Sequence, residues 1–559
     1  MLRIPSTNQR QINLFNPEQL TLRHVLTSAA SKYSDKDSLA FVGSSPISYS
    51  QLQDSVAVQA QILLDNGISP GDRVAILSEN CPNWGISYLA ISTCGAIAVP
   101  ILPDFHANEV QNILKQSKAK GVFVSKKLRA KISGTKSSDL LIISTADMKI
   151  ESAPVFKSKK KQEKFNYPDI EIKENDIAAI IFTSGTTGHS KGVILTHKNI
   201  VANAIDGGNS FTKLNEDERL VSLLPLSHTY ECTLGFVLPL LIGASIYYIN
   251  GKPVPTAIMA AMEKVKPTIV FSIPLIIEKI FKLKILPQLK KNPVTRGLYK
   301  FGFPRKKLHQ IAGKKLIESF GGKLHLFGIG GAPLSLRTEK FLLDAGFPYY
   351  CAYGLTESSP LVTGASEEKR LGSVGQILPT IETKIEKSHP DQKEGELYIK
   401  GPSIMQGYYK DPETTSEVLS DDGWLKTGDL CHIDEDNYLY IHGRSKNMIL
   451  GPSGENIYPE EIESILLTHR YVVESIVYEH QDKVVARVHP DYELIQKDFE
   501  HENLEPHQSK KRMQEIIEEI RTETNEQLSS FSRINRIIEQ EDPFTKTPTQ
   551  KIKRYLYVT

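Results

Sequence analysis

The residues whose chemistry stands out first are the small, polar and basic ones of FTSGTTGHSKGV, at positions 182–193. Glycine lets backbone amides approach an anion closely, while Thr and Ser hydroxyls and a Lys ammonium add donors and charge. Counting from Gly185, a Walker A loop would need its second glycine where Ser190 stands, and Ser or Thr after Lys191, where the chain has glycine. The stretch is therefore either a phosphate-binding loop of another type or an ordinary surface turn.

Strands are expected on both sides of this loop, because the VILTH that follows it is β-branched. Elsewhere RVAIL (73–77) and AIAVPIL flank an apolar-periodic helix, and TIVFSIP (268–274) and KLHLFGIGGAP (323–333) continue the alternation. Buried β-branched runs that alternate with helices predict mostly parallel sheets flanked by helices. Residues 150–172 are polar and lysine-rich, which favours a surface linker.

The pattern changes near residue 430. DEDNYLYIHGRSKNMIL predicts a hairpin that turns at Asp436–Asn437, and PEEIESILLTH a helix with proline in its first turn. Two strands in ESIVYEHQDKVVARVHP and an amphipathic helix over 508–529 complete a small α+β unit. We expect it to be a separate domain.

Composition limits the class of protein. The chain has 559 residues, too many for one core, with 40% hydrophobic and 24% charged residues, as in ordinary globular proteins. No run approaches the roughly 20 apolar residues that span a bilayer. The first fifteen residues hold no apolar signal core, and five cysteines lie far apart without a CxxC pair. These features favour a reducing cytoplasm and argue against a disulfide framework or a zinc site.

The net charge of +2 conceals an asymmetry. Between Lys279 and Ile317 the chain has twelve Lys and Arg and no Asp or Glu, so the remainder carries about −10. The stretch is either a solvated helical surface or a contact for anionic lipid or an acidic protein. It has no aromatic RNA-binding motif and no helix-turn-helix pattern, so we expect no nucleic acid partner.

Eight further segments follow the loop in a fixed order, and together they resemble the adenylate-forming (ANL) superfamily of AMP-binding enzymes. TSGTTGHSKGV is similar to the signature loop of that superfamily, with Ser190 where proline is usual. The other segments are LPLSHTYE (224–231), GIGGAPL (328–334), YGLTE (353–357), GELYIKGPSIMQGYY (395–409), DGWLKTGD (422–429), GRSKN (443–447), GENIYPEEIE (454–463) and PTQKIKR (548–554). Their form looks most like the long-chain fatty acyl-CoA synthetases, and the resemblance covers roughly residues 20–556.

The resemblance implies an α/β fold. It consists of a large N-terminal adenylation domain, 1–444, whose mostly parallel sheets are flanked by helices and joined by a distorted β-barrel. A small mobile α+β C-terminal domain, 445–559, completes it. The implied reaction is attack of a carboxylate on the α-phosphate of ATP, release of pyrophosphate, and displacement of AMP by a thiol.

The resemblance also assigns roles to single residues. The triphosphate grip is Thr183, Ser184, Gly185, Thr186, Thr187, Gly188 and Lys191. The adenine and acyl pocket holds Gly330, Gly331, Ala332, Tyr353 and Gly354, and Thr356 meets the α-phosphate. Asp429 accepts hydrogen bonds from the ribose, Arg444 contacts ribose or phosphate, and Mg²⁺ lies at Glu357 and Thr186.

Lys551 is the implied catalytic cation, which stabilises charge on the α-phosphate, although Lys546 and Lys553 lie close to it in sequence. His228 borders the acyl carboxylate and the thiol path; otherwise it is a core histidine. Because Lys551 must enter for adenylation and withdraw for thiol attack, we expect the C-terminal domain to rotate near Lys446. Many relatives have Asp at that hinge.

The acid and the thiol remain open in the sequence. A fatty acid with CoA as cosubstrate is the favoured interpretation, and acyl carrier protein is the alternative acceptor. The basic residues 279–317 would then contact either the inner face of a membrane or an acidic carrier protein. Further alternatives are an enzyme that stops at acyl-AMP and a non-catalytic nucleotide-binding scaffold.

Overall fold

The computed structural model describes residues 18–134, 140–153, 170–183, 190–211, 214–291, 293–299, 301–366, 368–387, 389, 392–451, 455–502, 506–547 and 551–558. Among these residues, no helix combines the length and the hydrophobicity needed to cross a bilayer. All five cysteines are free thiols, as expected.

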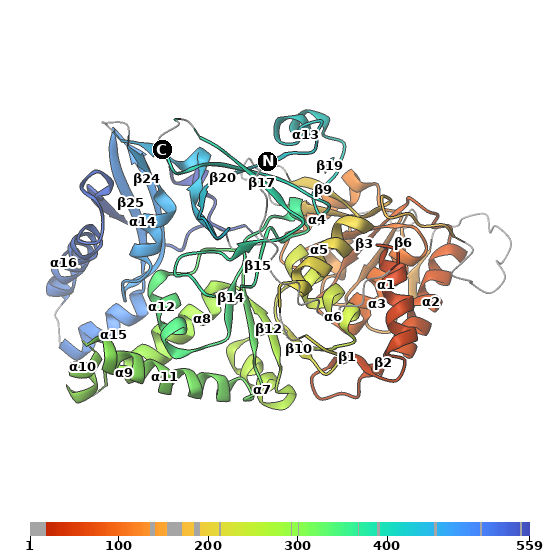
Figure 1. Cartoon of the computed structure of the whole chain (residues 1–559), viewed down its shortest axis with the longest axis horizontal. Helices are drawn as coiled ribbons and strands as arrows, with labels where there is room; N and C mark the ends of the chain where they lie inside the picture. Colours follow the sequence, from red (N-terminus) through yellow and green to blue (C-terminus); the bar gives the residue numbers. More distant parts are fainter. Residues whose placement is uncertain are drawn as a thin grey trace.

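Two large sheets form the N-terminal part of the chain (Figure 1). The first has the order β14-β13-β12-β10-β11-β1-β2 and is parallel except at β2. Its strands are β14 (Tyr349–Cys351), β13 (Leu326–Ile329), β12 (Ile269–Ser272), β10 (Arg219–Ser222), β11 (Ser245–Tyr248), β1 (Asp37–Phe41) and β2 (Ile47–Ser48).

The second sheet has the order β19-β9-β8-β4-β3-β5-β6-β7 and is parallel in its centre, from β8 to β6. Its strands are β19 (Gly407–Tyr408), β9 (Lys191–Thr196), β8 (Ile177–Thr183), β4 (Ile97–Pro100), β3 (Arg73–Leu77), β5 (Gly121–Val124), β6 (Leu141–Ser144) and β7 (Ile150–Ser152). The prediction that a linker begins at residue 150 is therefore wrong. β7 pairs with β6, because an edge strand tolerates a polar sequence.

The main core lies between these sheets. Helix α3 (Pro82–Thr93) is buried on all sides and contacts β1 of one sheet and β3 and β4 of the other. Trp84 stacks on Tyr88 at 5.3 Å between ring centroids, and a Cβ at Gly85 would lie 2.6 Å from the Phe236 ring. Only glycine therefore permits this approach.

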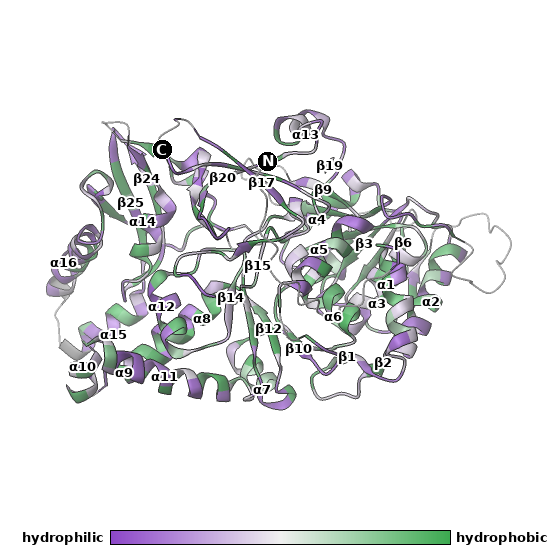
Figure 2. Cartoon of the chain, in the orientation of Figure 1, coloured by the Kyte–Doolittle hydropathy of each residue, from purple (hydrophilic) through white to green (hydrophobic). Residues whose placement is uncertain are grey.

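The other helices of the N-terminal part pack around these sheets, and α5 and α6 contribute to the main core (Figure 1). They are α1 (Leu22–Lys32), α2 (Tyr49–Asp65), α4 (Ala107–Ser117), α5 (His197–Asn209), α6 (Leu238–Ile242), α7 (Pro255–Val265), α8 (Pro274–Ile280), α9 (Leu286–Leu289), α10 (Pro293–Tyr299), α11 (Gly302–Ser319), α12 (Leu336–Ala345) and α13 (Pro412–Val418). Apolar residues gather inside and polar residues outside along most of them (Figure 2).

A four-stranded antiparallel sheet, β17-β18-β20-β21, follows in the chain. Its strands are β17 (Glu382–Glu386), β18 (Gly395–Lys400), β20 (Leu425–Ile433) and β21 (Leu439–Arg444). The hairpin of β20 and β21 turns at Asp436–Asn437 as predicted, and Asn437 has the positive φ of 63° that such a turn requires. A closed barrel stays a prediction.

The C-terminal part contains two small sheets. One is the pair β22 (Ile449–Leu450) and β23 (Asn456–Ile457), and the other consists of β24 (Val472–His480), β25 (Lys483–Pro490) and β26 (Arg536–Glu539). Its helices are α14 (Pro459–Leu466), α15 (Tyr492–Glu502) and α16 (Pro506–Asn525). Its own buried cluster runs from Ile449 to Ile534. The helix expected at 508–529 begins and ends a few residues earlier. The large α/β part and the α+β C-terminal part confirm the expected fold class.

Candidate active site

The ends of the glycine-rich loop are held by two antiparallel strands. Thr183 ends β8 and pairs with Lys191, which begins β9, and the Thr183 hydroxyl donates to the Lys191 carbonyl at 3.4 Å. The loop thus joins two strands, as predicted, and the Lys191 side chain emerges at a fixed point. The remaining grip candidates lie outside the described residues: Ser184, Gly185, Thr186, Thr187 and Gly188.

A chain of three side chains leads from this loop to Glu357. The Lys191 ammonium lies 5.1 Å from the centre of the Tyr408 ring, a cation–π contact. The Tyr408 hydroxyl donates to Glu357 Oε1 at 2.9 Å, and β19 places Tyr408 beside β9. Sequence reasoning assigned no role to Tyr408, although it stands in the segment 395–409 that carried part of the resemblance.

The YGLTE segment adopts a tight turn. Gly354 pairs with Leu361 across an isolated bridge, and a Cβ at Gly354 would lie 2.0 Å from the Pro360 carbonyl oxygen. Glycine is therefore required. Thr356 and Glu357 follow in a 3₁₀ turn, Thr356–Ser358, and the Glu357 carbonyl accepts from the Met405 amide at 2.9 Å. This contact anchors the turn to the segment that carries Tyr408.

Asp429 and Arg444 face each other on β20 and β21. Arg444 Nε lies 2.9 Å from Asp429 Oδ1, and the Tyr353 hydroxyl donates to Asp429 Oδ2. Burial raises the pKa of Asp429, while Arg444, the Tyr353 hydrogen bond and Lys551 oppose that rise. The structure thus brings together Tyr353, Asp429 and Arg444, three of the residues that the sequence assigned to the nucleoside.

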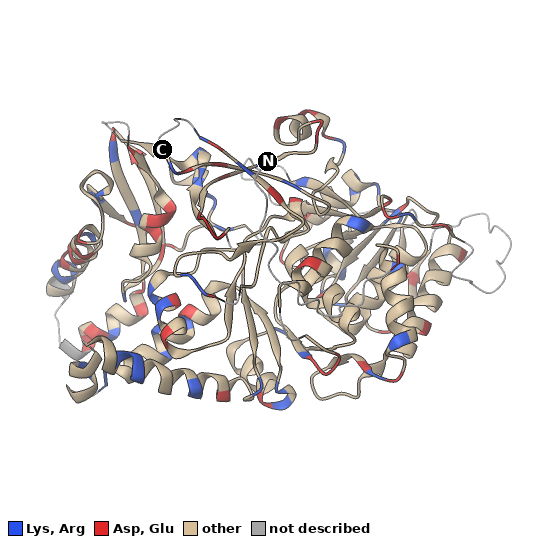
Figure 3. Cartoon of the chain, in the orientation of Figure 1, with Lys and Arg blue, Asp and Glu red and all other residues tan. Residues whose placement is uncertain are grey.

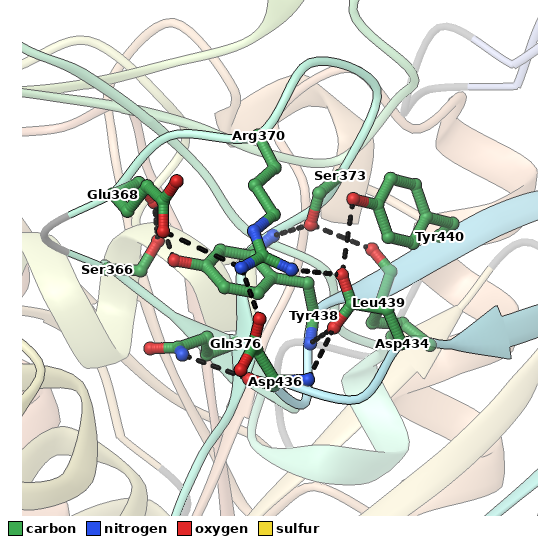
Figure 4. A network of polar contacts seen from close by, with 11 residues as sticks. Ser366, Glu368, Arg370, Ser373, Gln376, Asp434, Asp436, Tyr438, Leu439 and Tyr440 are labelled. Atoms are coloured by element: carbon green, nitrogen blue, oxygen red, sulfur yellow. Dashed lines mark hydrogen bonds and ion pairs between the residues drawn. The ribbon is translucent and has the colours of Figure 1, made fainter.

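An ionic network fixes this hairpin against the chain that follows YGLTE (Figure 4). Arg370 pairs with Asp434 at 2.6 Å and with Asp436, and its guanidinium stacks 4.2 Å from the Tyr438 ring centre. The Tyr438 hydroxyl donates to the Glu368 carbonyl at 2.7 Å. Two carboxylates raise the pKa of Arg370, so the cation stays charged and the hairpin keeps its position.

Lys551 reaches the same region from the C-terminal end of the chain. Its amide donates to the Thr547 hydroxyl at 3.1 Å and its carbonyl accepts from the Thr547 amide at 2.7 Å, so the backbone of Lys551 is held beside Thr547. Its side chain keeps an exposed surface, yet desolvation and then Arg444 lower its pKa, while Asp429 and Glu357 oppose the change. The Lys551 side chain is therefore partly surrounded by protein, and the charges of Arg444, Asp429 and Glu357 act on it.

The neighbouring tail lysine is engaged elsewhere. Lys546 forms an ion pair with Glu474, whose side chain is partly buried. Of the two, only Lys551 therefore acts electrostatically on Asp429.

His228 lies near enough to Lys551 for the two charges to interact. Burial and then the charge of Lys551 lower the pKa of its imidazole to about 4, so the ring is neutral near pH 7. The Tyr230 amide donates to His228 Nδ1 at 3.2 Å, which assigns the ring proton to Nε2. An Nε2–H group can donate to an acyl carboxylate without competing with Lys551 for a negative charge.

Tyr230 joins the His228 segment to the GIGGAPL segment. A Cβ at Gly330 would lie 3.3 Å from the Tyr230 ring, and Gly331 has a φ of +84°, which favours glycine. Ala332 follows on the exposed side of this turn. Among the adenine and acyl candidates, Gly330 therefore packs against the Tyr230 ring.

The residues at the expected magnesium site fit a hard cation. Within the described part of the chain Glu357 forms no ion pair, and Oε2 keeps its lone pairs beside the Tyr408 bond to Oε1. No cluster of three or more His, Cys, Asp and Glu occurs among the described residues. One carboxylate with phosphate oxygens and water is a typical Mg²⁺ environment, whereas an all-protein cage is not.

The expected hinge follows β21 directly. Ser445–Asn447 forms one 3₁₀ turn and Lys446 is exposed. Contacts on either side link it to α14: Asn447 donates to Glu460 at 2.6 Å, and His442 Nδ1 lies 2.6 Å from Glu461 Oε1. A rotation at Lys446 must break the contact between His442 and Glu461, because these two residues lie on opposite sides of the turn.

Comparison with known proteins gives consistent results. A family model described as AMP-binding enzyme matches residues 26–409. The chain is 29% identical over 482 residues to a peroxisomal OPC-8:0-CoA ligase 1 of Arabidopsis thaliana, covering 83% of this chain and 82% of that protein. It is 29% identical over 495 residues to a long-chain-fatty-acid–CoA ligase of Bacillus subtilis, with 82% of each chain covered.

Solved structures with the same fold include two ATP complexes. MatB of Rhodopseudomonas palustris with ATP has a TM-score of 0.73 at 24% identity, covering 96% of this chain and 98% of that chain. The O-succinylbenzoate coenzyme A synthetase of Bacillus subtilis, with ATP and magnesium, has a TM-score of 0.73 at 20% identity, covering 95% and 98%.

Proposed function

The chain belongs to the family of AMP-binding enzymes, and on this premise we propose that it activates a carboxylic acid with ATP and transfers the acyl group to a thiol. The observation that carries the proposal is the convergence of Lys551, from the C-terminal tail, on Asp429, Arg444 and Glu357. A tail lysine without such a role would lie in water rather than face two carboxylates and an arginine.

In the first half-reaction, a carboxylate oxygen of the acid attacks the α-phosphorus of ATP. The P–O bond to pyrophosphate breaks, and an acyl-AMP anhydride forms. Lys551 would stabilise the growing negative charge on the α-phosphate, and Thr356 would orient it. Lys191 and the loop of Thr183, Ser184, Gly185, Thr186, Thr187 and Gly188 would hold the β- and γ-phosphates. Mg²⁺ held at Glu357 and Thr186 would neutralise phosphate charge.

The nucleoside would lie between β20–β21 and the turn of Tyr353 and Gly354. Both Asp429 oxygens already have partners, Arg444 and Tyr353, so ribose hydroxyls would share or replace those bonds. Gly330, Gly331 and Ala332 would border adenine and the acyl chain, and neutral His228 would orient the carboxylate.

In the second half-reaction, a thiolate attacks the acyl carbonyl carbon and AMP departs with the bonding electrons. We propose that residues 445–559 form the mobile domain and 1–444 the large one, with rotation at Lys446. This boundary is supported by a separate buried cluster that begins at Ile449. Withdrawal of Lys551 would open the thiol path.

Lys551→Ala tests the first half-reaction. Acid-dependent release of pyrophosphate from Mg-ATP should fall by roughly a hundredfold or more, because the cation acts only as charge develops. Lys553→Ala, in the same tail, is the matched control and should stay near wild-type activity. Thioester formation from synthetic acyl-AMP should survive in Lys551→Ala. Pyrophosphate release that is unchanged in Lys551→Ala would exclude the role of this residue.

The finer proposal is a long-chain fatty acid as substrate and CoA as acceptor. The similarity to the fatty-acid ligase of Bacillus subtilis supports it, while other similar proteins are named for different acids, such as feruloyl-CoA synthase. Acyl carrier protein remains the alternative acceptor. Palmitate, ATP and Mg²⁺ offered with CoA and holo-carrier protein together would decide through the thioester formed. A protein that binds ATP and forms neither adenylate nor thioester would be a non-catalytic scaffold.

We place the protein in the cytoplasm, supported by its five free cysteines.

A further inference from the structure

Helices α9, α10 and α11 form an outer layer at the lower edge of the molecule (Figure 1). Exposed basic side chains follow this layer and the end of α8, and the blue segments of Figure 3 mark them. We call this surface the basic face, and it comprises Lys279, Lys284, Lys290, Lys291, Arg296, Lys306, Lys307, Lys314 and Lys315.

The charge of the basic face is not balanced locally. Residues 279–317 contain no Asp or Glu. Within the described ranges, none of the nine side chains forms an ion pair with a carboxylate. Desolvation and the charges of Arg337 and Arg296 lower the pKa of Lys290, so a further cation lies beside the face. The surface therefore attracts anions over a distance set by ionic strength.

Large apolar side chains protrude among these cations. Helix α10 buries none of its residues. The exposed fractions are 58% for Leu283, 70% for Val294, 66% for Phe301, 76% for Phe303 and 57% for Ile311. Phe301 and Phe303 stand at the turn into α11, and the Lys307 ammonium lies 5.9 Å from the centre of the Phe303 ring. Isolated exposed apolar residues are common, but this many in one short stretch mark an interaction surface.

Apolar and basic residues alternate along the exposed side of α11. Phe303, Lys307, Ile311 and Lys315 are exposed and recur every four positions, which places them along one side of a helix. The inward side holds His309, Gly313 and Leu316. His309 bonds to buried Asp344 at 3.1 Å, which anchors α11 to α12. The helix is therefore packed firmly, and its exposed stripe is not a misplaced core face.

Two kinds of partner offer negative charge, but only one suits both features. An acidic protein would pair with the lysines, yet it would need shaped pockets for apolar side chains spread over three helices. A bilayer surface of anionic lipid presents phosphate at the level of the lysines and hydrocarbon just below, without a fixed shape. We propose that the basic face docks on an anionic membrane surface, with Phe301 and Phe303 inserted between the lipid chains.

This proposal goes beyond the proposed reaction and does not depend on it, because docking needs neither ATP nor acid. It would place the enzyme where sparingly soluble fatty acids are concentrated.

Vesicle co-sedimentation tests the docking. The wild-type chain should bind vesicles that contain phosphatidylglycerol with phosphatidylcholine, should bind phosphatidylcholine alone weakly, and should be released by salt. Phe301→Ser with Phe303→Ser, and separately Lys306→Gln, Lys307→Gln, Lys314→Gln and Lys315→Gln together, should each weaken binding by roughly tenfold or more.

Matched controls carry the same changes elsewhere. Val58→Ser replaces an exposed apolar residue of α2, and Lys126→Gln, Lys127→Gln, Lys510→Gln and Lys511→Gln remove four charges outside the face. Both controls should bind like wild type. Thermal melting identifies any variant that fails to fold, in which case the lipid and salt dependence of the wild type decides.

Equal wild-type binding to both vesicle types, or none to either, would overturn the proposal. So would lysine-dependent binding of an acidic carrier protein without vesicle binding, which would assign the face to a protein partner.

Discussion

Among single residues, Tyr408 has the most informative position, because it contacts both Lys191 of the proposed phosphate loop and the proposed metal ligand Glu357. Its hydroxyl donates to Glu357 Oε1 and its ring lies under the Lys191 ammonium. The neighbouring carboxylate and burial raise the pKa of Tyr408, so it remains a donor throughout the physiological range. It is therefore a positioning residue for Glu357.

Replacement of Tyr408 by phenylalanine should raise the Mg²⁺ concentration needed for half-maximal adenylation by roughly tenfold, because the carboxylate loses its orienting bond. The maximal rate at saturating Mg²⁺ should change less. Tyr409→Phe is the matched control, since its hydroxyl makes only a 3.5 Å contact with the Ser117 carbonyl. A Tyr408→Phe enzyme with unaltered Mg²⁺ dependence would refute the positioning role.

Glu231 gives a second prediction at this scale. Burial raises its pKa to about 8, Ser222 donates to Oε1 at 2.6 Å, and Oε2 has no partner within the described residues. The folded chain retains this proton until about pH 8, while the unfolded chain releases it near pH 4.5. Folded stability is therefore lost as pH rises through this window.

Glu231→Gln removes that proton uptake with little change in shape. The melting temperature of the variant, relative to wild type, should be higher at pH 8 than at pH 5, as measured by calorimetry. Glu318→Gln, on the exposed side of α11, should show no such pH-dependent difference. If the melting temperature of Glu231→Gln differed from that of wild type by the same amount at both pH values, the proposed protonation would be contradicted.

At the scale of elements, the sequence predicted the strands and helices where periodicity is strong. β3, α3, β4, α14, β24 and β25 fall where their hydrophobic patterns place them. β7 was missed, because an edge strand needs no apolar run. The roles of the motif residues rest on the resemblance and stay predictions. Tyr408 and the Arg370 network were not, because their partners lie more than fifty residues away and no local pattern records such contacts.

The turn Ser445–Asn447 supports a prediction about the proposed hinge. Lys446→Pro fixes φ and removes an amide, so it should slow the thioester step by roughly tenfold or more and leave adenylation within a fewfold. Lys446→Ala keeps the backbone free and is the control. The two half-reactions are measured separately, by pyrophosphate release and by thiol transfer from preformed acyl-AMP. If Lys446→Pro slowed both half-reactions equally, a hinge at this position would be excluded.

At the scale of the molecule, two contacts hold the C-terminal part against the helices beside the basic face. The Lys282 ammonium donates to the Val472 carbonyl at 2.7 Å, and Arg337 donates to the Thr468 carbonyl at 3.2 Å. These bonds belong to the arrangement in which Lys551 interacts with Asp429 and Glu357. They should therefore favour adenylation over thiol transfer.

Lys282→Ala should lower the adenylation rate by roughly fivefold, since one charged hydrogen bond that stabilises the closed arrangement is lost. Thiol transfer from preformed acyl-AMP should be unchanged or faster. Lys284→Ala, an exposed neighbour in the same π-helical turn, Phe281–Ile285, is the control. Slower thiol transfer with normal adenylation would contradict this interpretation.

The position of Lys282 has a thermodynamic consequence. Lys282 lies within residues 279–317, which we propose to contact lipid. Its ammonium donates a hydrogen bond to Val472, which belongs to the C-terminal domain proposed to rotate. If a bilayer alters the geometry of that turn, it shifts the balance between the two catalytic poses. Because such a linkage is reciprocal, the two catalytic conformations must then bind the bilayer with different affinities. Nucleotide analogues that trap one pose should accordingly change how tightly the protein adheres to vesicles.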